Sequence, residues 1–208
     1  GRSRHELESV TVEEALAHPT WSMGPRITID SATLMNKAFE VIEAHYLYAI
    51  PYDRIDVVVH PQSIVHSLVE FVDGTLKAEL GDPDMRVPIQ YAITYPARYS
   101  GNLDPFDLTA SPLEFEPPRR DDFPCLDLGY WAGRTGRSAP AVLNAADEVA
   151  VAAFLDGRIP FLAIADVVAA TLDYLPIVEL NNVADVLAVD AEARKAATRF
   201  VEVTGEVR

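Results

Sequence analysis

A proline-rich stretch constrains this 208-residue chain more than any other feature. Six prolines fall between residues 96 and 124, and no helical period of apolar residues runs through them. Proline lacks a backbone N–H and fixes its own φ, so such a stretch favours an irregular connector over a helix or a central strand. We therefore expect an α/β (α+β) portion with a small mixed sheet at residues 1–95, the connector at 96–124, and an all-α helical bundle at 125–208.

The residues after the connector carry apolar side chains at helical spacing in four successive stretches. These stretches are residues 125–134, 138–157, 161–175 and 190–203. Ser138 and Asp190 are suitable N-caps, and Gly157 suits a helix C-terminus. Amphipathic helices in this order favour a small antiparallel bundle. Asn144 and Glu148, one turn apart, are interpreted as packing or helix stabilisation.

The residues before the connector mix helix and strand signals. Thr11 and Glu14 have capping-box spacing, which predicts a short helix over residues 11–18. Asp73-Gly74 between two β-type runs is a strong hairpin signal. The other expected elements are a short strand at 27–29, a helix at 33–48, an apolar strand at 55–60, hairpin strands at 64–71 and 75–80, and a helix from Pro88 to Tyr95.

The longest helix expected before the connector has a polar face with a cation close to its start. If Asp30 and Ser31 form the N-cap, Lys37 lies in the second turn, where the helix dipole disfavours a positive charge unless an anion is bound. Ser31, Asn36 and Lys37, with free backbone amides, form a candidate phosphate site. Glu40, one turn further along, is a candidate ligand for a bridging cation. Such polar stripes more often simply face water, and that alternative stays open.

Two histidines and an aromatic loop are further candidates. His66 lies in HPQSIVHS, after an expected buried strand, although a lone histidine on an apolar face is more often a packed core residue. His18 precedes the loop WSMGPR. In that loop Trp21 and Met23 would form either a lid over a substrate or a contact with another domain.

The charge balance excludes several classes of partner. Seventeen Lys and Arg against 32 Asp and Glu give a formal net charge of −15. This charge repels nucleic acid and anionic membranes, so an anionic ligand needs a local positive site or a metal. No signal peptide or membrane-length apolar run is present, and the single Cys125 excludes an internal disulfide. We expect a cytoplasmic protein. Because the chain begins with glycine, we also expect it to be part of a longer one.

Five motifs, in this order, resemble the 1-deoxy-D-xylulose 5-phosphate reductoisomerase family. They are HPTWSMG, DSATLMNK with the following Glu40, HPQSIVHS, LGDPDMR and VLNAADEVAVAAFL. The resemblance covers nearly the whole chain. It implies the NADPH-dependent rearrangement and reduction of 1-deoxy-D-xylulose 5-phosphate to 2-C-methyl-D-erythritol 4-phosphate, in non-mevalonate isoprenoid biosynthesis. It also implies a divalent metal, Mg²⁺, Mn²⁺ or Co²⁺, that acts as a Lewis acid on the substrate oxygens.

The resemblance further implies which residues contact the phosphosugar substrate. These residues are Ser22, Ser31, Asn36, Lys37, Trp21, Met23 and Glu40. Ser31, Asn36 and Lys37 would bind its phosphate or hydroxyls, in agreement with the candidate phosphate site. Trp21 and Met23 would cover it from a flexible lid, and Met23 would also contact NADPH.

Catalysis, metal binding and part of the cofactor contact are likewise implied by the resemblance. Glu40, His18 and His66 would have catalytic roles. Glu40 would be a metal ligand, with Glu43 as its close neighbour. Met85, in the turn DPDMR, would pack near the nicotinamide or the substrate.

The chain departs from the family pattern at its N-terminal side. No G-x-G-x-x-G motif is present for NADPH, and the family's other metal ligands, an Asp and a Glu, belong to a segment before residue 1. Mg²⁺ needs several oxygen ligands, so we expect this chain to be inactive alone. The family implies a homodimer, and an unpaired strand edge would favour association as well. The alternatives are a stand-alone phosphosugar-binding or regulatory module and a purely structural fragment.

Overall fold

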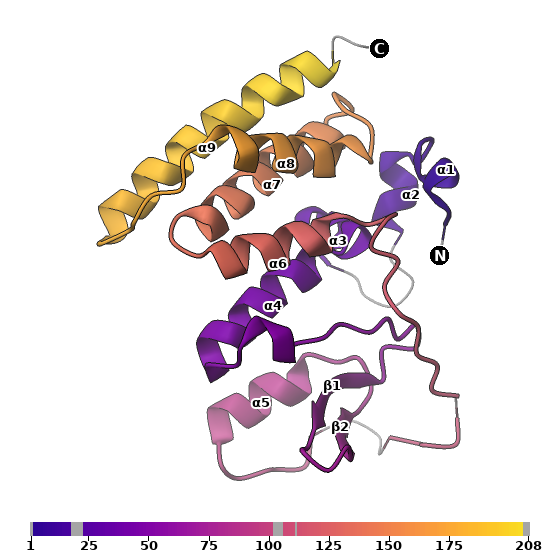
Figure 1. Ribbon diagram of the computed structural model, residues 1–208. Coiled ribbons are helices and arrows are strands. Elements are labelled where there is room, and N and C mark those ends of the chain that lie inside the picture. The colour runs from indigo at the N-terminus through magenta and orange to yellow at the C-terminus, as the bar shows by residue number, and fades with distance from the viewer. Residues whose placement is uncertain (1, 18–22, 102–105, 111, 206–208) are drawn as a thin grey trace. The chain divides into compact units, whose positions relative to one another are not determined.

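The computed structural model describes residues 2–17, 23–101, 106–110 and 112–205, which form two compact units (Figure 1). The helical unit contains the described residues up to Val57 and those from Pro118 onward. The hairpin unit contains the described residues from Val58 to Pro117. Contacts between neighbouring segments thus place residues 23–57 with the C-terminal helices. The expected domain boundaries after residues 95 and 124 stay a prediction.

The helical unit joins short N-terminal helices to longer C-terminal ones. Its helices are α1 Arg4–Leu7, α2 Val12–Leu16, α3 Pro25–Thr33, α4 Met35–Tyr48, α6 Cys125–Thr135, α7 Ala139–Leu155, α8 Ala163–Tyr174 and α9 Val183–Gly205, with the 3-10 turn η1 Tyr52–Arg54. α7, α8 and α9 pack against one another, while α6 contacts both α4 and α7 (Figure 1). The expected helical bundle is therefore present, but α3 and α4 belong to the same unit.

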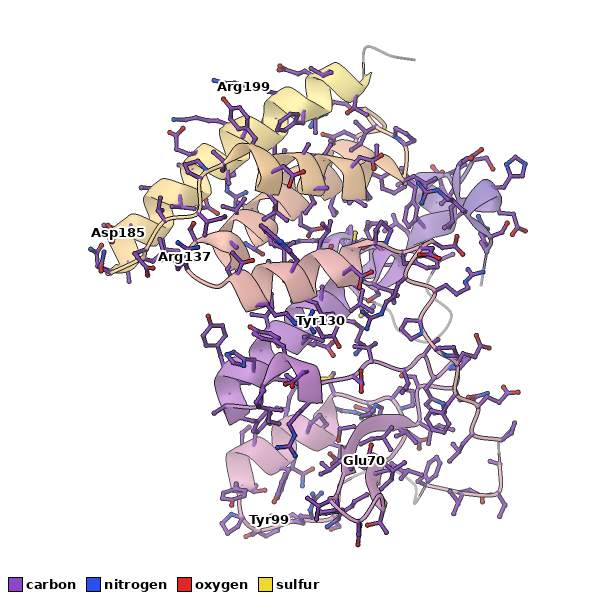
Figure 2. The ribbon with its side chains drawn as sticks, viewed as in Figure 1. Glu70, Tyr99, Tyr130, Arg137, Asp185 and Arg199 are labelled. Carbon is purple, nitrogen blue, oxygen red and sulfur yellow. The ribbon has the colours of Figure 1, made fainter. Side chains whose placement is uncertain are left out.

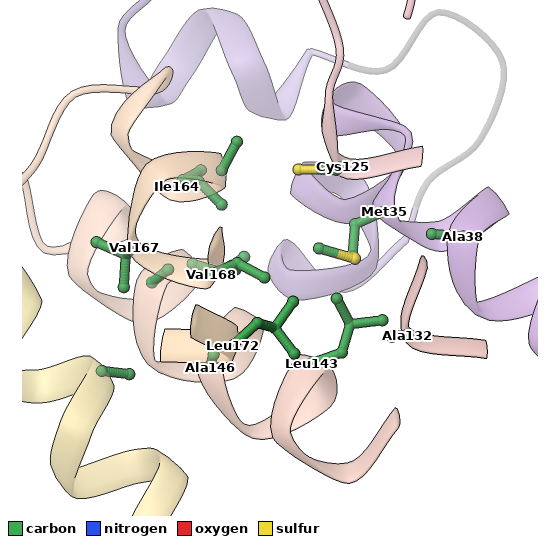
Figure 3. Close-up of a cluster of buried hydrophobic side chains, with 14 of the residues drawn as sticks. Met35, Ala38, Cys125, Ala132, Leu143, Ala146, Ile164, Val167, Val168 and Leu172 are labelled. Atoms are coloured by element: carbon green, nitrogen blue, oxygen red, sulfur yellow. The ribbon is translucent and has the colours of Figure 1, made fainter. Parts of the chain in front are cut away.

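One core joins these helices (Figure 3). Met35 and Ala38 of α4, Leu143 of α7 and Val168 of α8 are fully buried in it. Alanine-rich stretches let the helices approach closely, and Gly129 of α6 has the same effect against α4. A Cβ atom there would lie 2.3 Å from the Cβ of Ala38.

Several expected ends of helices are confirmed in the structure. The hydroxyl of Thr11 accepts from the Glu14 amide, and the Glu14 carboxylate accepts from the Thr11 amide, which completes the capping box of α2. Gly157 follows α7 with φ = 70°, a conformation that favours glycine. Ser138 precedes α7, but its hydroxyl accepts from the Val178 amide instead of capping the helix.

Three sequence expectations about the helical unit are wrong. Residues 27–29 form part of α3 rather than a strand. Asp30 and Ser31 lie within α3, because the chain breaks only at Leu34, which adopts a left-handed conformation with φ = 64° before α4 begins. Asp190 is an internal residue of α9, because that helix already begins at Val183.

The hairpin unit contains an antiparallel pair of strands and one helix. β1 Val65–Glu70 pairs with β2 Leu76–Leu80, and an irregularity interrupts the register between Val65 and Ser67. The turn at Asp73-Gly74 confirms the predicted hairpin, with Gly74 at φ = 80°. The helix is α5 Arg86–Thr94, which begins two residues before the expected Pro88.

The expected mixed sheet is wrong for the described part of the chain, in which the sheet has only these two antiparallel strands. Residues 55–60 do not form the predicted strand. Only Val59 makes a bridge, to Glu116. In the helical unit, the hydroxyl of Tyr130 on α6 donates to the Ile55 carbonyl at 2.7 Å (Figure 2). No helix among the described residues is long and apolar enough to cross a membrane.

Candidate functional site

The first turns of α4 bring three of the predicted site residues together. The Asn36 amide Nδ2 donates to Glu40 Oε1 at 2.6 Å, and Lys37 Nζ donates to Glu40 Oε2 at 2.5 Å. We call Asn36, Lys37 and Glu40 the α4 polar cluster. Helical spacing of three and four residues places both donors next to one carboxylate. Asn36, Lys37 and Glu40 thus share one face of the helix, as their spacing predicted, while their roles in a site stay a prediction.

The surroundings of the α4 polar cluster suit an anion. The N-cap residue Leu34 makes no side-chain cap, and the first turn of α4 contains no acidic residue. The Met35 amide donates to the Thr33 hydroxyl at 3.3 Å, whereas no acceptor among the described residues is recorded for the next two amides, where the helix dipole is positive. Lys37 and Glu40 each expose 45% of their side chains, so a ligand can reach both. The cluster offers donors to an anion and, once those donors turn away, two oxygens to a cation.

A hollow of about 610 Å³ lies beside the cluster, between α3, α4 and α7. Apolar side chains, among them Ile27, Phe39 and Ile42, form part of its wall. Polar groups from all three helices complete the wall, namely Arg26, Asp30, Asn36, Glu43 and Asn144. Asn36 thus belongs both to the polar cluster and to the hollow. Lys37 and Glu40 are not among the residues that line it.

The other predicted site residues are distributed over the molecule. Ser31 is half-buried in α3, and Met23 is half-buried just before that helix. His66 is exposed on β1, and Met85 is 56% exposed at the start of α5, both in the hairpin unit. The expectations for His18, Trp21 and Ser22 lie outside the described residues.

The donor set suits a divalent metal only in part. Glu40 offers carboxylate oxygens, which Mg²⁺ prefers, and Glu43 lies about one turn further along α4. Among the residues that the structure describes, no three His, Cys, Asp or Glu side chains gather into a metal-binding group. The described part of this chain therefore offers Glu40 as a single candidate ligand and no group of three.

An ionic network around Arg26 was not predicted from the sequence. Arg26 of α3 donates to Asn144 Oδ1 of α7 at 2.8 Å and also pairs with Glu148. Its Nε lies 3.5 Å from Asp30 Oδ2, and its Nη2 lies 3.6 Å from Asp147 Oδ2. The polar spacing of Asn144 and Glu148 was the available signal, but their partner stands more than 100 residues earlier in the chain.

The same network continues to α9 and contains two carboxyl groups with perturbed acidity. Arg194 pairs with Glu148 and donates to Asp190 at 2.7 Å. Burial raises the pKa of Asp30 against the opposing effect of Arg26. Burial also raises the pKa of Asp147 well above its usual range, and the charge of Asp30 adds to the effect. Burial thus disfavours the ionised form of both carboxyl groups, and of Asp147 more strongly.

Family comparisons match both ends of the described helical unit. A model described as the DXP reductoisomerase C-terminal domain matches residues 80–196. A second one, described as the 1-deoxy-D-xylulose 5-phosphate reductoisomerase C-terminal domain, matches residues 1–48. Together they include the α4 polar cluster and the Arg26 network.

Two relatives named 1-deoxy-D-xylulose 5-phosphate reductoisomerase are each 53% identical to this chain over 197 residues. The relative from Dechloromonas aromatica matches 94% of this chain and 50% of its own length. The relative from Bacillus subtilis matches 93% of this chain and 51% of its own length. The chain therefore spans about half the length of these relatives.

Solved structures agree with the sequence matches. A DOX-P reductoisomerase in complex with NADPH, fosmidomycin and magnesium has a TM-score of 0.92 at 42% identity, over 97% of this chain and 52% of that one. The reductoisomerase from Zymomonas mobilis in complex with NADPH has a TM-score of 0.90 at 43% identity, over 96% of this chain and 52% of that one. This chain belongs to the 1-deoxy-D-xylulose 5-phosphate reductoisomerase family.

Proposed function

We propose that this chain is the substrate-facing and C-terminal part of an NADPH- and metal-dependent reductoisomerase. The whole enzyme would convert 1-deoxy-D-xylulose 5-phosphate to 2-C-methyl-D-erythritol 4-phosphate in non-mevalonate isoprenoid biosynthesis. The observation that carries this proposal is the α4 polar cluster in the first turns of a helix whose start has no acidic residue. This chain is 53% identical to two relatives named 1-deoxy-D-xylulose 5-phosphate reductoisomerase. The donors of its α4 polar cluster suit a phosphosugar.

The cluster suggests how substrate binding would prepare the site. Lys37 and Asn36 now donate to Glu40. An incoming phosphate would accept from these donors and from the backbone amides of Asn36 and Lys37, with Ser31 as a further donor. Glu40 would then lose both of its present partners, and its oxygens would be available to a cation. Phosphate binding and metal binding would therefore support each other.

The remaining roles extend this proposal to the rest of the chain. His18, Trp21, Ser22 and Met23 would form the substrate lid, and His66 would shape the pocket. Met23 and Met85 would contact the nicotinamide of NADPH. A divalent metal, when bound, supplies a Lewis acid for the rearrangement, with Glu40 as one of its ligands and Glu43 nearby. The chain would act as a homodimer in the cytoplasm, with an NADPH-binding domain before it.

A chimera tests the proposed function. The N-terminal part of the Dechloromonas aromatica relative, up to the start of its match, would be joined to this chain. We expect NADPH oxidation, followed by absorbance, only in the presence of 1-deoxy-D-xylulose 5-phosphate and Mg²⁺. A chimera that is folded by circular dichroism and shows no such turnover would contradict the proposal.

The chain alone distinguishes the enzyme from a stand-alone binding module. We expect no NADPH oxidation by the 208-residue chain, because Glu40 is a single metal ligand. Measurable turnover by the chain alone would show that it carries a complete active site. A regulatory module would instead bind the phosphosugar tightly by itself, measured by calorimetry, and would remain inactive in the chimera.

A further inference from the structure

The carboxyl group of Asp147 is the most deeply buried charge-bearing group that the proposed reaction does not use. Its side chain is fully buried in α7. Neither of its oxygens has a hydrogen-bond donor among the described residues, and Asp30 Oδ1 also lacks a donor there. Arg26 directs its hydrogen bonds to Asn144 and Glu148 and approaches Asp147 no closer than 3.6 Å. An ionised Asp147 would therefore be buried without hydrogen bonds, which is strongly unfavourable.

The groups that face Asp147 do not offset the cost of burying its charge. From α3 it meets Arg26 and Asp30, and from α6 the buried thiol of Cys125. Beside it on α7, Glu148 takes hydrogen bonds from Arg26 and from Arg194 of α9. Arg194 is shared with Asp190, and from α8 the acid Asp166 acts electrostatically on Cys125. The two arginines are thus outnumbered by carboxyl groups.

A proton between Asp30 and Asp147 resolves this imbalance. Both carboxyl groups face the Arg26 guanidinium, with Asp30 Oδ2 at 3.5 Å from its Nε and Asp147 Oδ2 at 3.6 Å from its Nη2, and each affects the pKa of the other. A neutral Asp147 can donate its O–H to Asp30, while Asp30 keeps its charge beside Arg26 at 3.5 Å. Asp147 is then a neutral acid, and Asp30 accepts its O–H. No buried oxygen of the pair is left both charged and without a hydrogen-bond donor. Like-charged carboxyl groups that share a site behave in this way in general, because both cannot ionise.

We propose that Asp30 and Asp147 share one proton, carried by Asp147, and that this pair is a positioning device that fixes α3 on α7. Asp30, one member of the pair, directly precedes Ser31 in the chain. The pair therefore sets where Ser31 and the start of α4 lie. The consequence for Ser31 as a substrate contact rests on the proposed function, whereas the shared proton does not.

The pH dependence of stability tests which protonation state is present. If the folded pKa of Asp147 lies above the unfolded value, the stabilisation by the pair is complete below the unfolded pKa and is lost as the pH rises through the folded pKa. Asp147→Asn keeps the size and a donor but cannot ionise. Relative to wild type, its unfolding temperature should be nearly unchanged at about pH 4 and higher by about 4 °C at about pH 8.

A matched control isolates this effect from a general change of charge. Asp173 is an exposed aspartate on α8, and Asp173→Asn should show a difference from wild type that does not grow with pH. If Asp147→Asn is destabilised at pH 8 more than at pH 4, Asp147 is ionised in a salt bridge with Arg26, and the proposal is overturned.

A spectroscopic measurement on the wild-type chain is independent of any variant's folding. In a chain labelled with ¹³C-aspartate, one carboxyl resonance should titrate at a higher pH than all the others, and it should be absent from Asp147→Asn. Ordinary titration of every aspartate would contradict a shared proton.

Hydrogen exchange at Ser31 tests the positioning role. Asp147→Ala should speed amide exchange at Ser31 selectively, and Asp147→Asn should restore it. Unchanged exchange at Ser31 in Asp147→Ala would limit the pair to its shared proton and refute positioning. Failure of the chimera to turn over, with these results intact, would instead count only against the proposed function.

Discussion

Lys37 stands in the first turn of α4, where the helix dipole disfavours a cation, and only Glu40 pairs with it among the described residues. If its role is to bind phosphate, Lys37→Ala in the chimera removes a charge-assisted hydrogen bond. We expect kcat/KM for the phosphosugar to fall roughly 30-fold, which corresponds to about 2 kcal/mol. Steady-state kinetics measures this change.

Lys195 is a matched control for Lys37. It also pairs with a glutamate three residues away, Glu192 at 2.7 Å, but it lies on α9. Lys195→Ala should leave kcat/KM unchanged. If both variants lose the same activity, the loss at Lys37 reflects stability rather than phosphate binding.

A second prediction about a single residue concerns Arg26. Arg26→Met removes the cation that faces Asp30, Asp147 and Glu148 while keeping much of the side-chain volume. Because the guanidinium is partly exposed, we expect a loss of about 2 kcal/mol in the free energy of unfolding at neutral pH, below the range for fully buried pairs. Urea denaturation measures it, and the loss should shrink at low pH as the carboxyl groups take up protons.

The control for Arg26 is an exposed arginine in a weak pair. Arg158 lies 3.8 Å from Asp156, and both side chains are about half exposed or more. Arg158→Met should change stability by no more than about 0.5 kcal/mol. Equal effects at the two positions would show that Arg26 is an ordinary surface residue.

The sequence predicted the α4 polar cluster but not the Arg26 network, and the reason is the range of the contacts. Asn36, Lys37 and Glu40 are neighbours on one helix, so their spacing alone brings them together. Asn144 and Glu148 have the same kind of spacing, yet the residue that both contact, Arg26, comes from a distant segment. Local periodicity cannot reveal such a partner.

At the level of helices, Gly129 sets the distance between α6 and α4. The missing side chain lets Ala38 approach so closely that a Cβ atom at residue 129 would lie 2.3 Å from the Ala38 Cβ and 2.8 Å from its Cα. Gly129→Ala must therefore force the two helices apart. We expect a loss of about 3 kcal/mol in the free energy of unfolding, even though alanine favours a helix, measured by urea denaturation.

Gly81 provides the comparison for Gly129. No atom lies within 4 Å of a Cβ built there, among the described residues, so Gly81→Ala should be nearly neutral. A neutral Gly129→Ala would mean that α4 and α6 are not held in close contact. Since α4 carries the polar cluster, Gly129→Ala in the chimera should also reduce turnover.

Local signals predicted helices and turns well where the backbone itself requires particular residues. The capping box of Thr11 and Glu14 and the turn at Asp73-Gly74 are both present. Predictions failed where packing decides the outcome. Residues 27–29 are β-branched and look like a strand, but they lie in α3, where Thr28 and Ile29 are buried and Ile27 is exposed. Asp190 resembles an N-cap, yet α9 continues through it and uses it to bind Arg194.

For the whole molecule, the balance between apolar surface and charge governs self-association. The hairpin unit exposes apolar side chains on and beside its two strands, namely Leu68, Val69, Phe71, Val72, Leu76 and Leu80. In the described part of the chain these strands have no further neighbour, so a free edge can pair with a second copy. The net charge of −15 opposes this association.

Association through the hairpin should therefore increase with salt. Raising the ionic strength from about 0.01 M to about 0.1 M shortens the Debye length from about 30 Å to about 10 Å and screens the repulsion between two copies. Sedimentation velocity should show a larger dimer fraction at the higher salt. Val69→Lys, on β1, should suppress it, because a charge on an edge strand blocks pairing. Val203→Lys, at an exposed valine of α9, should not. A monomer at both salt concentrations would rule out the hairpin as a self-association surface, and equal suppression by both variants would show that the effect is not specific to the edge strand.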